Sequence, residues 1–231
     1  MGAGIVTMKE VSPIPVAVSW SGGKDAALAL SRVLNDDRYH VAALLCAVDM
    51  YRDRVLTHDV HRALIEEQAH SLGLPVEFAP LPAQPDERLT MLTVHQVLRH
   101  LRAQCGVGGI VYGDIFQEEA RSFRAAHLEA AGFEAIFPLW HGSTRQLANE
   151  FCESNYSGFV VCADYDKLGE RFCGRRLDRQ FFRELPGGVD PCGENGEFHT
   201  FVTSGPIFDF EIHVSPQPAV RHGRFVYCDL R

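Results

Sequence analysis

The sequence lacks the features that would place the chain in a membrane or on nucleic acid. Among its 231 residues, no apolar run approaches the roughly 20 residues that a membrane-spanning helix needs, and the N-terminus carries no charged-then-apolar signal pattern. Positive charge is also scarce, since 22 Lys and Arg stand against 30 Asp and Glu, a formal net charge of −8. The electrostatic field of a protein with this net negative charge disfavours non-specific binding to nucleic acid or anionic lipid. We therefore expect a cytoplasmic protein without a membrane or nucleic-acid partner.

Closely spaced cysteines are missing as well. The seven cysteines are scattered between Cys46 and Cys228, and no two of them form a Cys-x-x-Cys pair. This odd, unpatterned set suits reduced thiols better than disulfides or a zinc site. The sequence also has no internal repeat, low-complexity tract or heptad pattern, so we expect an ordinary globular fold with a sizeable core.

The most informative stretch that is present runs from Val16 to Leu30. The apolar residues 16–18 predict a buried strand, Ser21-Gly22-Gly23-Lys24-Asp25 a turn, and Ala26 to Leu30 the start of a helix. Glycines let the backbone approach an anion, the first amides of the helix point at it, and Lys24 adds a full charge. A tight turn alone would not require a lysine and an aspartate. The stretch therefore predicts a phosphate-binding loop, although its spacing is not that of Walker A.

Alternating strands and helices follow this loop. We predict strands over 16–18, 41–48, 75–78, 109–112 and 134–137, and helices over 25–35, 59–72, 86–105 and 117–131, while residues 1–14 have no periodicity. Such alternation is typical of a doubly wound parallel sheet, in which ligands bind beyond the carboxyl ends of the strands. Polar residues and glycine stand at those ends: Ser19, Ser21, Asp49, Gly113 and Asp114. Arg121 and Arg124, on the helix predicted over 117–131, could reach the phosphates, but a solvated face is the interpretation we prefer.

A domain boundary is expected near Pro138-Leu139-Trp140. It divides the chain into residues 1–137 and a smaller α+β domain over 138–231. In that second domain we predict helices near 143–153 and 175–185, and strands over 158–163, 198–203, 207–214 and 224–230.

A loop rich in glycine and acidic residues lies in the second domain. Gly187, Gly188, Gly193 and Gly196 surround a set of polar residues: Asp190, Glu194, Asn195, Glu197, His199 and Thr200. Ordering so many glycines is entropically costly, which favours a site that binds metal, orients an amine or moves protons. A solvated acidic turn before a strand remains the alternative. Cys192, beside the loop, is expected to be a small buried residue.

The order Ser-Gly-Gly-Lys-Asp after a strand resembles the PP-loop of the N-type ATP pyrophosphatases. The loop is followed along the chain by His58, Gln68–Pro75, Tyr112–Ile115 and Gly193–Val202. This set of motifs, in this order, resembles the diphthine–ammonia ligase family and its bacterial relatives. The likeness extends from about Val16 to Phe210. It implies a Rossmann-like PP-loop domain followed by a smaller domain that carries the acidic glycine motif.

The resemblance also implies functional residues. The ATP-binding set is Ser19, Ser21, Gly22, Gly23, Lys24, Asp25, Gly113 and Asp114, to which we add Asp49 at a strand end and His58 before a helix; the acceptor-facing set is Glu194, Asn195, Glu197 and His199. Asp25 and Asp114 are candidate Mg²⁺ ligands. His58 as a simple helix cap remains an alternative. The chain departs from the family at Ala26, where these loops usually have Ser, at Asn195 for Gly, and at His199 for Glu.

The implied reaction is AMP-forming amide ligation: ATP adenylates a carboxylate acceptor, pyrophosphate leaves, and ammonia or another amine forms the amide. The alternatives are a true diphthine–ammonia ligase and a non-catalytic adenine-nucleotide-binding protein. Sulfur transfer to RNA fits poorly without a cysteine pair or a basic surface. Asn195 and His199 predict a smaller or less cationic acceptor than diphthine. The acceptor, the amine source and a homodimer stay open.

Overall fold

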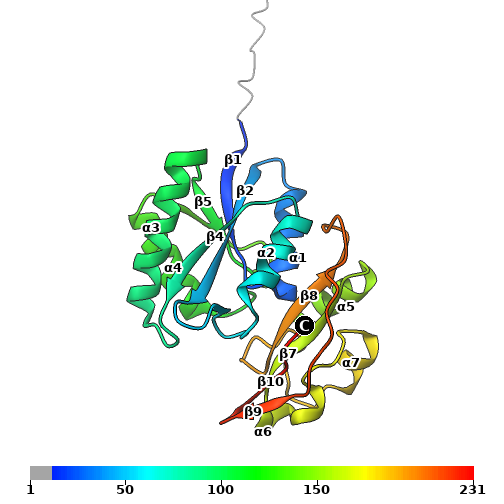
Figure 1. Cartoon of the computed structure of the whole chain (residues 1–231). Helices are drawn as coiled ribbons and strands as arrows, with labels where there is room; N and C mark the ends of the chain where they lie inside the picture. Colours follow the sequence, from blue (N-terminus) through cyan, green and yellow to red (C-terminus); the bar gives the residue numbers. More distant parts are fainter. Residues whose placement is uncertain (1–11) are drawn as a thin grey trace, which may run out of the picture.

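The computed structural model describes residues 12–231, in which two β-sheets are each accompanied by helices (Figure 1). The larger sheet has five parallel strands in the order β4-β2-β1-β5-β6, and the short β3 pairs antiparallel with β2. Their bounds are β1 Ile14–Ser19, β2 Tyr39–Asp49, β3 Arg54–Val55, β4 Val76–Leu81, β5 Gly109–Val111 and β6 Glu134–Ile136. The predicted doubly wound parallel sheet is confirmed.

Helices cover both faces of this sheet. They are α1 Lys24–Leu34, α2 Arg62–Ser71, α3 Glu87–Cys105 and α4 Glu118–Ala130, and Figure 1 shows α3 and α4 on one side of the strands with α1 and α2 on the other. Alternate residues of β1 pack on opposite faces of the sheet. Val16 and Val18 belong to the apolar cluster that includes α1 and α2, whereas Ala17 belongs to the cluster that includes α3 and α4. A strand buried on both faces needs the continuous apolar run that the sequence has here.

The second sheet is antiparallel, with the order β8-β7-β10-β9. Its elements are α5 Thr144–Glu153, β7 Ser157–Asp164, α6 Tyr165–Leu168, a 3₁₀ turn Glu170–Phe172, α7 Arg179–Glu184, β8 Phe198–Ser204, β9 Val220–His222 and β10 Phe225–Tyr227. Strand β8 and helix α5 contact α1, and one apolar cluster runs from Leu28 of α1 to Phe201 of β8. The two halves therefore share a core across α1, and the division at 137/138 stays a prediction.

Several predicted elements differ from the structure. No strand forms over 207–214: Ile212 is buried, and its amide donates to the Thr203 carbonyl, so the alternating pattern reflects packing on β8 without a ladder. Helix α7 begins only after Asp178, whose side chain accepts from the Phe181 amide as an N-cap, and not at 175. Of the strand predicted at 224–230 only β10 forms, and β3 and β9 were not predicted. Residues 1–11 of the irregular N-terminal stretch lie outside the described residues.

A membrane-crossing helix is not found within residues 12–231, because none of the helices there combines the length and the hydropathy that crossing requires.

The strand order reverses at β1, which has β2 on one side and β5 on the other. The loops that leave the carboxyl ends of β1 and β5 therefore diverge and leave a crevice between them, as at other such switch points. The start of β8 contacts the N-terminus of α1, because the Thr200 hydroxyl accepts from the Lys24 amide at 3.0 Å. The crevice is thus bounded by both sheets.

Candidate functional site

A cavity of about 340 Å³ occupies this crevice. It brings together many residues that the sequence singled out, from the loop after β1, the end of β5 and the loop before β8. Those lining it are Ser19, Ser21, Gly23, Lys24, Asp25, His58, Gly113, Asp114, Glu194 and His199. Residues that lie far apart in the chain thus share one site, as parallel strand ends and a crossing loop would place them.

The turn after β1 leads into α1 without a side-chain cap. Gly22 has a φ of +78°, and its carbonyl accepts from the Val202 amide at 2.8 Å, so it faces the second sheet and not the cavity. Gly23 is the N-cap residue of α1 and has no side chain to bond the helix amides. Among residues 12–231, the amides of Asp25 and Ala26 have no acceptor. The positive end of the α1 dipole is therefore available to an anion.

Lys24 links this turn to the acidic glycine-rich loop. Its ammonium is buried and donates to both carboxylate oxygens of Asp25, at 2.9 and 2.7 Å, and to the Cys192 carbonyl at 2.5 Å. Burial alone would lower the pKa of Lys24, but the Asp25 carboxylate and the other acidic groups nearby outweigh it, so the pKa is raised. Lys24 therefore remains a full positive charge beside the helix N-terminus.

The opposite wall comes from the end of β5. A Cβ atom on Gly113 would lie 2.9 Å from the Asp25 carbonyl carbon and 3.1 Å from the Ala26 nitrogen, so only glycine lets this wall approach the first turn of α1. The next residue, Asp114, forms an ion pair with Arg124 of α4, whose guanidinium also lies 4.9 Å from the centre of the Tyr112 ring. Arg124 thus lines the cavity instead of facing solvent as predicted.

We expect Gly113→Ala to distort the site. The added methyl group would push on backbone that cannot yield cheaply, so the melting temperature should fall and anion binding at the α1 N-terminus should weaken. Overpacking of this kind costs about 1–3 kcal/mol. Differential scanning calorimetry measures the change. Gly187→Ala is the matched control, because a Cβ there meets nothing within 4 Å; equal melting temperatures for the two variants would contradict the close approach.

Glu194 is the carboxyl group of the acidic loop that reaches the cavity. One of its oxygens accepts from the Ile115 amide at 3.2 Å, and its own carbonyl accepts from the Gln117 side chain at 2.7 Å. Burial, with the nearby Asp25 carboxylate, raises the pKa of Glu194 to about 7, against the opposing effect of the Ile115 hydrogen bond. This carboxyl group can therefore hold or release a proton near neutral pH.

Glu197 was predicted to face the acceptor, but in the structure it does not line the cavity. Its buried carboxylate accepts from the Asn195 amide at 2.9 Å and the Asp190 amide at 3.3 Å, and it lies 3.6 Å from the Lys167 ammonium. The Asn195 side chain also donates to it, at 3.1 Å, so neither residue lines the cavity. These contacts hold the loop that carries Glu194 in shape.

Asp49 is also turned away from the cavity, although it ends β2 as predicted. Its carboxylate accepts from the amides of Tyr51 and Arg52, at 2.9 and 3.2 Å, and from the Arg52 side chain at 2.8 Å. It therefore organises the turn between β2 and β3.

Two histidines form the wall beside Gly23. The rings of His58 and His199 lie 4.6 Å apart between centroids, and a Cβ on Gly23 would come within 3.1 Å of the His58 ring nitrogen Nε2. Burial and the neighbouring His199 hold the pKa of His58 well below its usual range, and burial with the Lys24 charge lowers the pKa of His199 to about 4. Both rings are thus neutral at pH 7. His58 is not the N-cap of α2, a position that His61 occupies.

These histidines should make the protein sensitive to acid. Because the folded-state pKa of His199 is about 4, below its usual 6.5, the unfolded chain gains a proton between those values that the folded chain does not. Stability should therefore fall as the pH drops from 6.5 to 4, by up to about 3 kcal/mol from this group. Urea unfolding of His199→Gln should show a shallower loss, whereas the exposed control His213→Gln should keep the full loss. An unchanged pH dependence in His199→Gln would contradict the assignment.

The chain matches two family profiles that together span almost all of the described residues. The profile of the diphthamide synthase N-terminal domain matches residues 14–133, and that of the diphthamide synthase C-terminal domain matches residues 143–231. The chain belongs to the diphthamide synthase family. The family resemblance that the sequence motifs indicated is thereby confirmed.

Curated relatives of this diphthamide synthase family member are named diphthine–ammonia ligase. The Danio rerio protein is 22% identical over 230 residues, covering 87% of each chain. The Rattus norvegicus protein is 22% identical over 235 residues, covering 93% of this chain and 88% of the relative. Among solved structures, a U34-tRNA thiolase from Methanococcus maripaludis matches 60% of this chain and 57% of its own, with a TM-score of 0.36 and 14% identity.

Sequence reasoning missed several residues that line the cavity of this family member. They are Tyr112, Gln117, Cys192 and Phe198, whereas Gly193, Gly196 and Thr200 already belonged to the acidic glycine-rich loop. Thr200 stood in the acidic loop motif, but only the fold shows that its hydroxyl accepts from the Lys24 amide. Cys192 is buried as expected, and burial raises the pKa of its thiol to about 12, so it is no nucleophile near neutral pH.

Proposed function

We propose that this protein is an ATP-dependent ligase that adenylates a carboxylate and then converts it to an amide, releasing AMP and pyrophosphate. The observation that carries the proposal is that one cavity is lined both by an uncapped helix N-terminus with the buried Lys24 and by a carboxyl group, Glu194, whose pKa is about 7. The helix N-terminus and Lys24 suit phosphates, and the Glu194 carboxyl group suits an amine. The names of the curated relatives support the same reaction class.

In this proposal the phosphates of ATP bind the N-terminus of α1. The amides of Asp25 and Ala26 donate to phosphate oxygens, and Lys24 adds a charge-assisted bond by exchanging one of its Asp25 contacts. These groups stabilise the charge that develops on departing pyrophosphate. Gly113 permits the close packing that keeps this turn in place.

The carboxylates of the cavity suit a magnesium ion. Asp25 and Asp114 line it, and both contribute negative charge that raises the pKa of Glu194. No cluster of three His, Cys, Asp or Glu side chains within residues 12–231 forms a ready-made metal cage. Mg²⁺ commonly needs only one or two carboxylates, because waters and substrate phosphates complete its shell. We therefore propose Asp25 and Asp114 as its protein ligands, and Mg²⁺ would offset the charge of the phosphates there.

Glu194 belongs to the amine half of the proposed reaction. Ammonia attacks only when it is unprotonated, and a carboxylate with a pKa near 7 can orient the amine and take a proton from it as the amide forms. The hydrogen bonds from Ile115 and Gln117 hold Glu194 against the end of β5. Residues Asn195 and Glu197 support this loop from behind and take no part in the chemistry.

The acceptor that we propose is less cationic than diphthine. Diphthine carries a trimethylammonium group, which carboxylates or aromatic faces would stabilise. Here His199 is neutral where diphthine–ammonia ligases have Glu, and Glu194 is only partly ionised at pH 7. The acidic loop thus presents little fixed negative charge to the cavity.

The test is a product analysis with purified protein, ATP, Mg²⁺ and ammonium. Candidate carboxylates and a diphthine-bearing elongation factor are supplied in parallel, and AMP, ADP, pyrophosphate and phosphate are measured by chromatography. We expect AMP and pyrophosphate in equal amounts, dependent on a carboxylate acceptor, and amide product by mass spectrometry. ADP release would contradict the reaction class. Binding of ATP without turnover under every condition would favour the non-catalytic alternative, and efficient amidation of diphthine would overturn the acceptor assignment.

A further inference from the structure

Gln68 of α2 is a buried polar side chain that the proposed function leaves unused. It belongs to the Gln68–Pro75 motif of the sequence and does not line the cavity. Its amide oxygen accepts from the Trp20 indole N–H at 2.9 Å. Its amide nitrogen donates to the carbonyl oxygens of Val202, at 2.7 Å, and Gly22, at 3.1 Å. One side chain thus joins the residue after β1, the turn before α1, and β8.

The three partners of Gln68 require an amide at this position. An indole N–H can only donate and a backbone carbonyl can only accept, so the partners fix which end of the amide is oxygen, and its oxygen and both N–H groups are used. Glutamate would turn a carboxylate oxygen toward a carbonyl oxygen, and leucine would leave the buried Trp20 N–H without this acceptor. Gln68 is therefore a specific joint between the two halves of the chain.

The contact with Gly22 sets the direction of a peptide group in the turn before α1. The Gly22 carbonyl accepts from Gln68 and from the Val202 amide, at 2.8 Å. In a planar trans peptide unit the carbonyl and the next N–H point in opposite directions, so the Gly23 N–H points away from Gln68 and β8. The acceptor that it meets is the Ser21 hydroxyl at 3.4 Å, longer than an ordinary hydrogen bond. Gly23 and Ser21 both line the cavity, so this amide is a donor on the cavity side.

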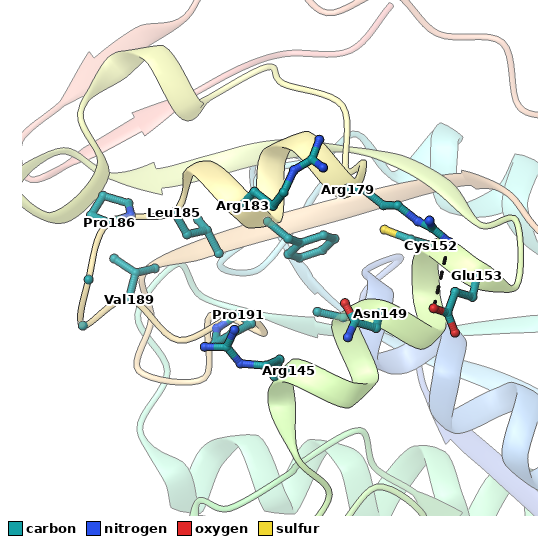
Figure 2. A pocket seen from close by; sticks show the side chains of 14 residues that line it. Arg145, Asn149, Cys152, Glu153, Arg179, Arg183, Leu185, Pro186, Val189 and Pro191 are labelled. Carbon is teal, nitrogen blue, oxygen red and sulfur yellow. Dashed lines mark ion pairs between the residues drawn. The ribbon is translucent and has the colours of Figure 1, made fainter.

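The contact with Val202 holds the acidic glycine-rich loop from its C-terminal side, because β8 follows that loop directly. On the other side of the loop, residues 185–191 run past a hollow between α5 and α7, as Figure 2 shows. A Cβ on Gly187 or Gly188 in that segment would meet nothing within 4 Å. The loop is therefore fixed chiefly through β8, which Gln68 ties to the turn before α1.

We propose that Gln68 is a positioning residue for the phosphate subsite: it holds the Gly22 carbonyl toward β8 and thereby turns the Gly23 amide to the cavity, where that amide donates to a phosphate oxygen of the nucleotide. The inference rests on the proposed function, because it needs phosphates at the N-terminus of α1. It adds Gly23 to the amides of Asp25 and Ala26 as a phosphate donor. Gln68 acts through the Gly22–Gly23 peptide group and does not itself touch the ligand.

Selective isotope labelling tests the proposal on the wild-type chain. With glycine supplied in cell-free synthesis as the source of carbonyl ¹³C and amide ¹⁵N, an HNCO spectrum shows the amides of glycines that follow another glycine: Gly23, Gly109 and Gly188. The probes are ATP, inorganic pyrophosphate and adenosine. We expect ATP and pyrophosphate to move the Gly23 amide proton downfield and adenosine to leave it in place. Gly109 and Gly188 are internal references and should not move.

The variant Q68L keeps most of the buried volume and removes the three hydrogen bonds. It should bind pyrophosphate about tenfold more weakly, since an amide contact to a charged group is lost, and its Gly23 resonance should no longer shift. The matched control is S71A, on the same face of α2 one turn later. Ser71 is also buried and also joins the two halves, because its hydroxyl donates to the Phe210 carbonyl at 2.6 Å. S71A should lower the melting temperature but keep pyrophosphate affinity and the Gly23 shift.

Equal losses of pyrophosphate affinity in Q68L and S71A would reduce Gln68 to a structural role and overturn the proposal, as would wild-type affinity in Q68L. Where Q68L does not fold, the wild-type spectra decide. Binding of ATP with an unmoved Gly23 resonance would overturn the inference and leave the proposed function standing. Absence of ATP and pyrophosphate binding by the wild-type chain in calorimetry would instead refute the phosphate site itself, and the inference with it.

Discussion

Replacing Lys24 with alanine is expected to weaken ATP binding by about tenfold to 150-fold, while adenosine binding stays the same. The reason is that a charge-assisted hydrogen bond from Lys24 to a phosphate contributes about 1.5–3 kcal/mol to binding. Adenosine has no phosphate, so it makes no such bond and loses nothing in the variant. Lys24 is the one lysine lining the cavity, and its ammonium lies beside the uncapped amides of α1. Isothermal titration calorimetry with ATP, AMP and adenosine measures the difference.

Loss of Lys24 also affects the folded protein, so the experiment needs controls. Without the ammonium, the Cys192 carbonyl loses a donor and Asp25 loses its ion-pair partner. Lys24→Met keeps most of the buried volume and should show the same selective loss of ATP affinity. Lys167→Ala removes another lysine, which pairs with Glu197 behind the loop, and should leave ATP affinity unchanged. An equal loss of ATP and adenosine affinity would show that Lys24 only maintains the fold.

The fold of the first half was predictable because its strands are buried on both faces. Val16 to Val18 and the run over 41–48 can satisfy their burial only in the middle of a helix-covered sheet. Farther along the chain, helix α3 has clear caps in Asp86 and Gly106. In the second half the strands pair antiparallel, with short ladders such as β9 and β10. Three-residue strands carry too little periodicity to distinguish them from loops such as 207–214.

The candidate site was predictable by residue type but not by side-chain direction. Asp49 and Asp114 both end parallel strands, yet Asp49 turns back onto the Tyr51 and Arg52 amides whereas Asp114 lines the cavity. Glu194 and Glu197 likewise share one loop, and only the first reaches the cavity. Local hydrogen bonds to the backbone decide each case, and sequence spacing does not reveal which acid will make them.

Arginines on α4 illustrate a second limit. Arg121 lies over the Trp140 ring, at 4.8 Å from its centre, and Arg124 pairs with Asp114. Both were expected to face solvent, because helical periodicity shows which face is polar but not what the polar face meets. Here it meets the loop after β5 and residues that follow β6. Long-range contacts of this kind appear only once the strand order is known.

Replacing Glu194 with glutamine is expected to abolish most amide formation while sparing ATP binding. Loss of a general base lowers kcat/KM by about 10²–10⁴-fold. Glutamine keeps an oxygen to accept from the Ile115 amide, so the loop should hold its position. Since the pKa of Glu194 is about 7 in the free protein, kcat/KM of the wild type should rise with pH through 7, and that rise should vanish in the variant. Rates are expressed per concentration of unprotonated amine.

Separate assays of the two half-reactions show which one needs Glu194. With ATP and the carboxylate that supports pyrophosphate release, exchange of labelled pyrophosphate into ATP needs no amine, so it should persist in Glu194→Gln. Glu129→Gln, an exposed acid on α4, should leave both half-reactions and the pH profile unchanged. Loss of the exchange reaction together with ATP affinity would instead place Glu194 in the nucleotide half of the site. An unaltered pH profile in Glu194→Gln would remove it from the chemistry altogether.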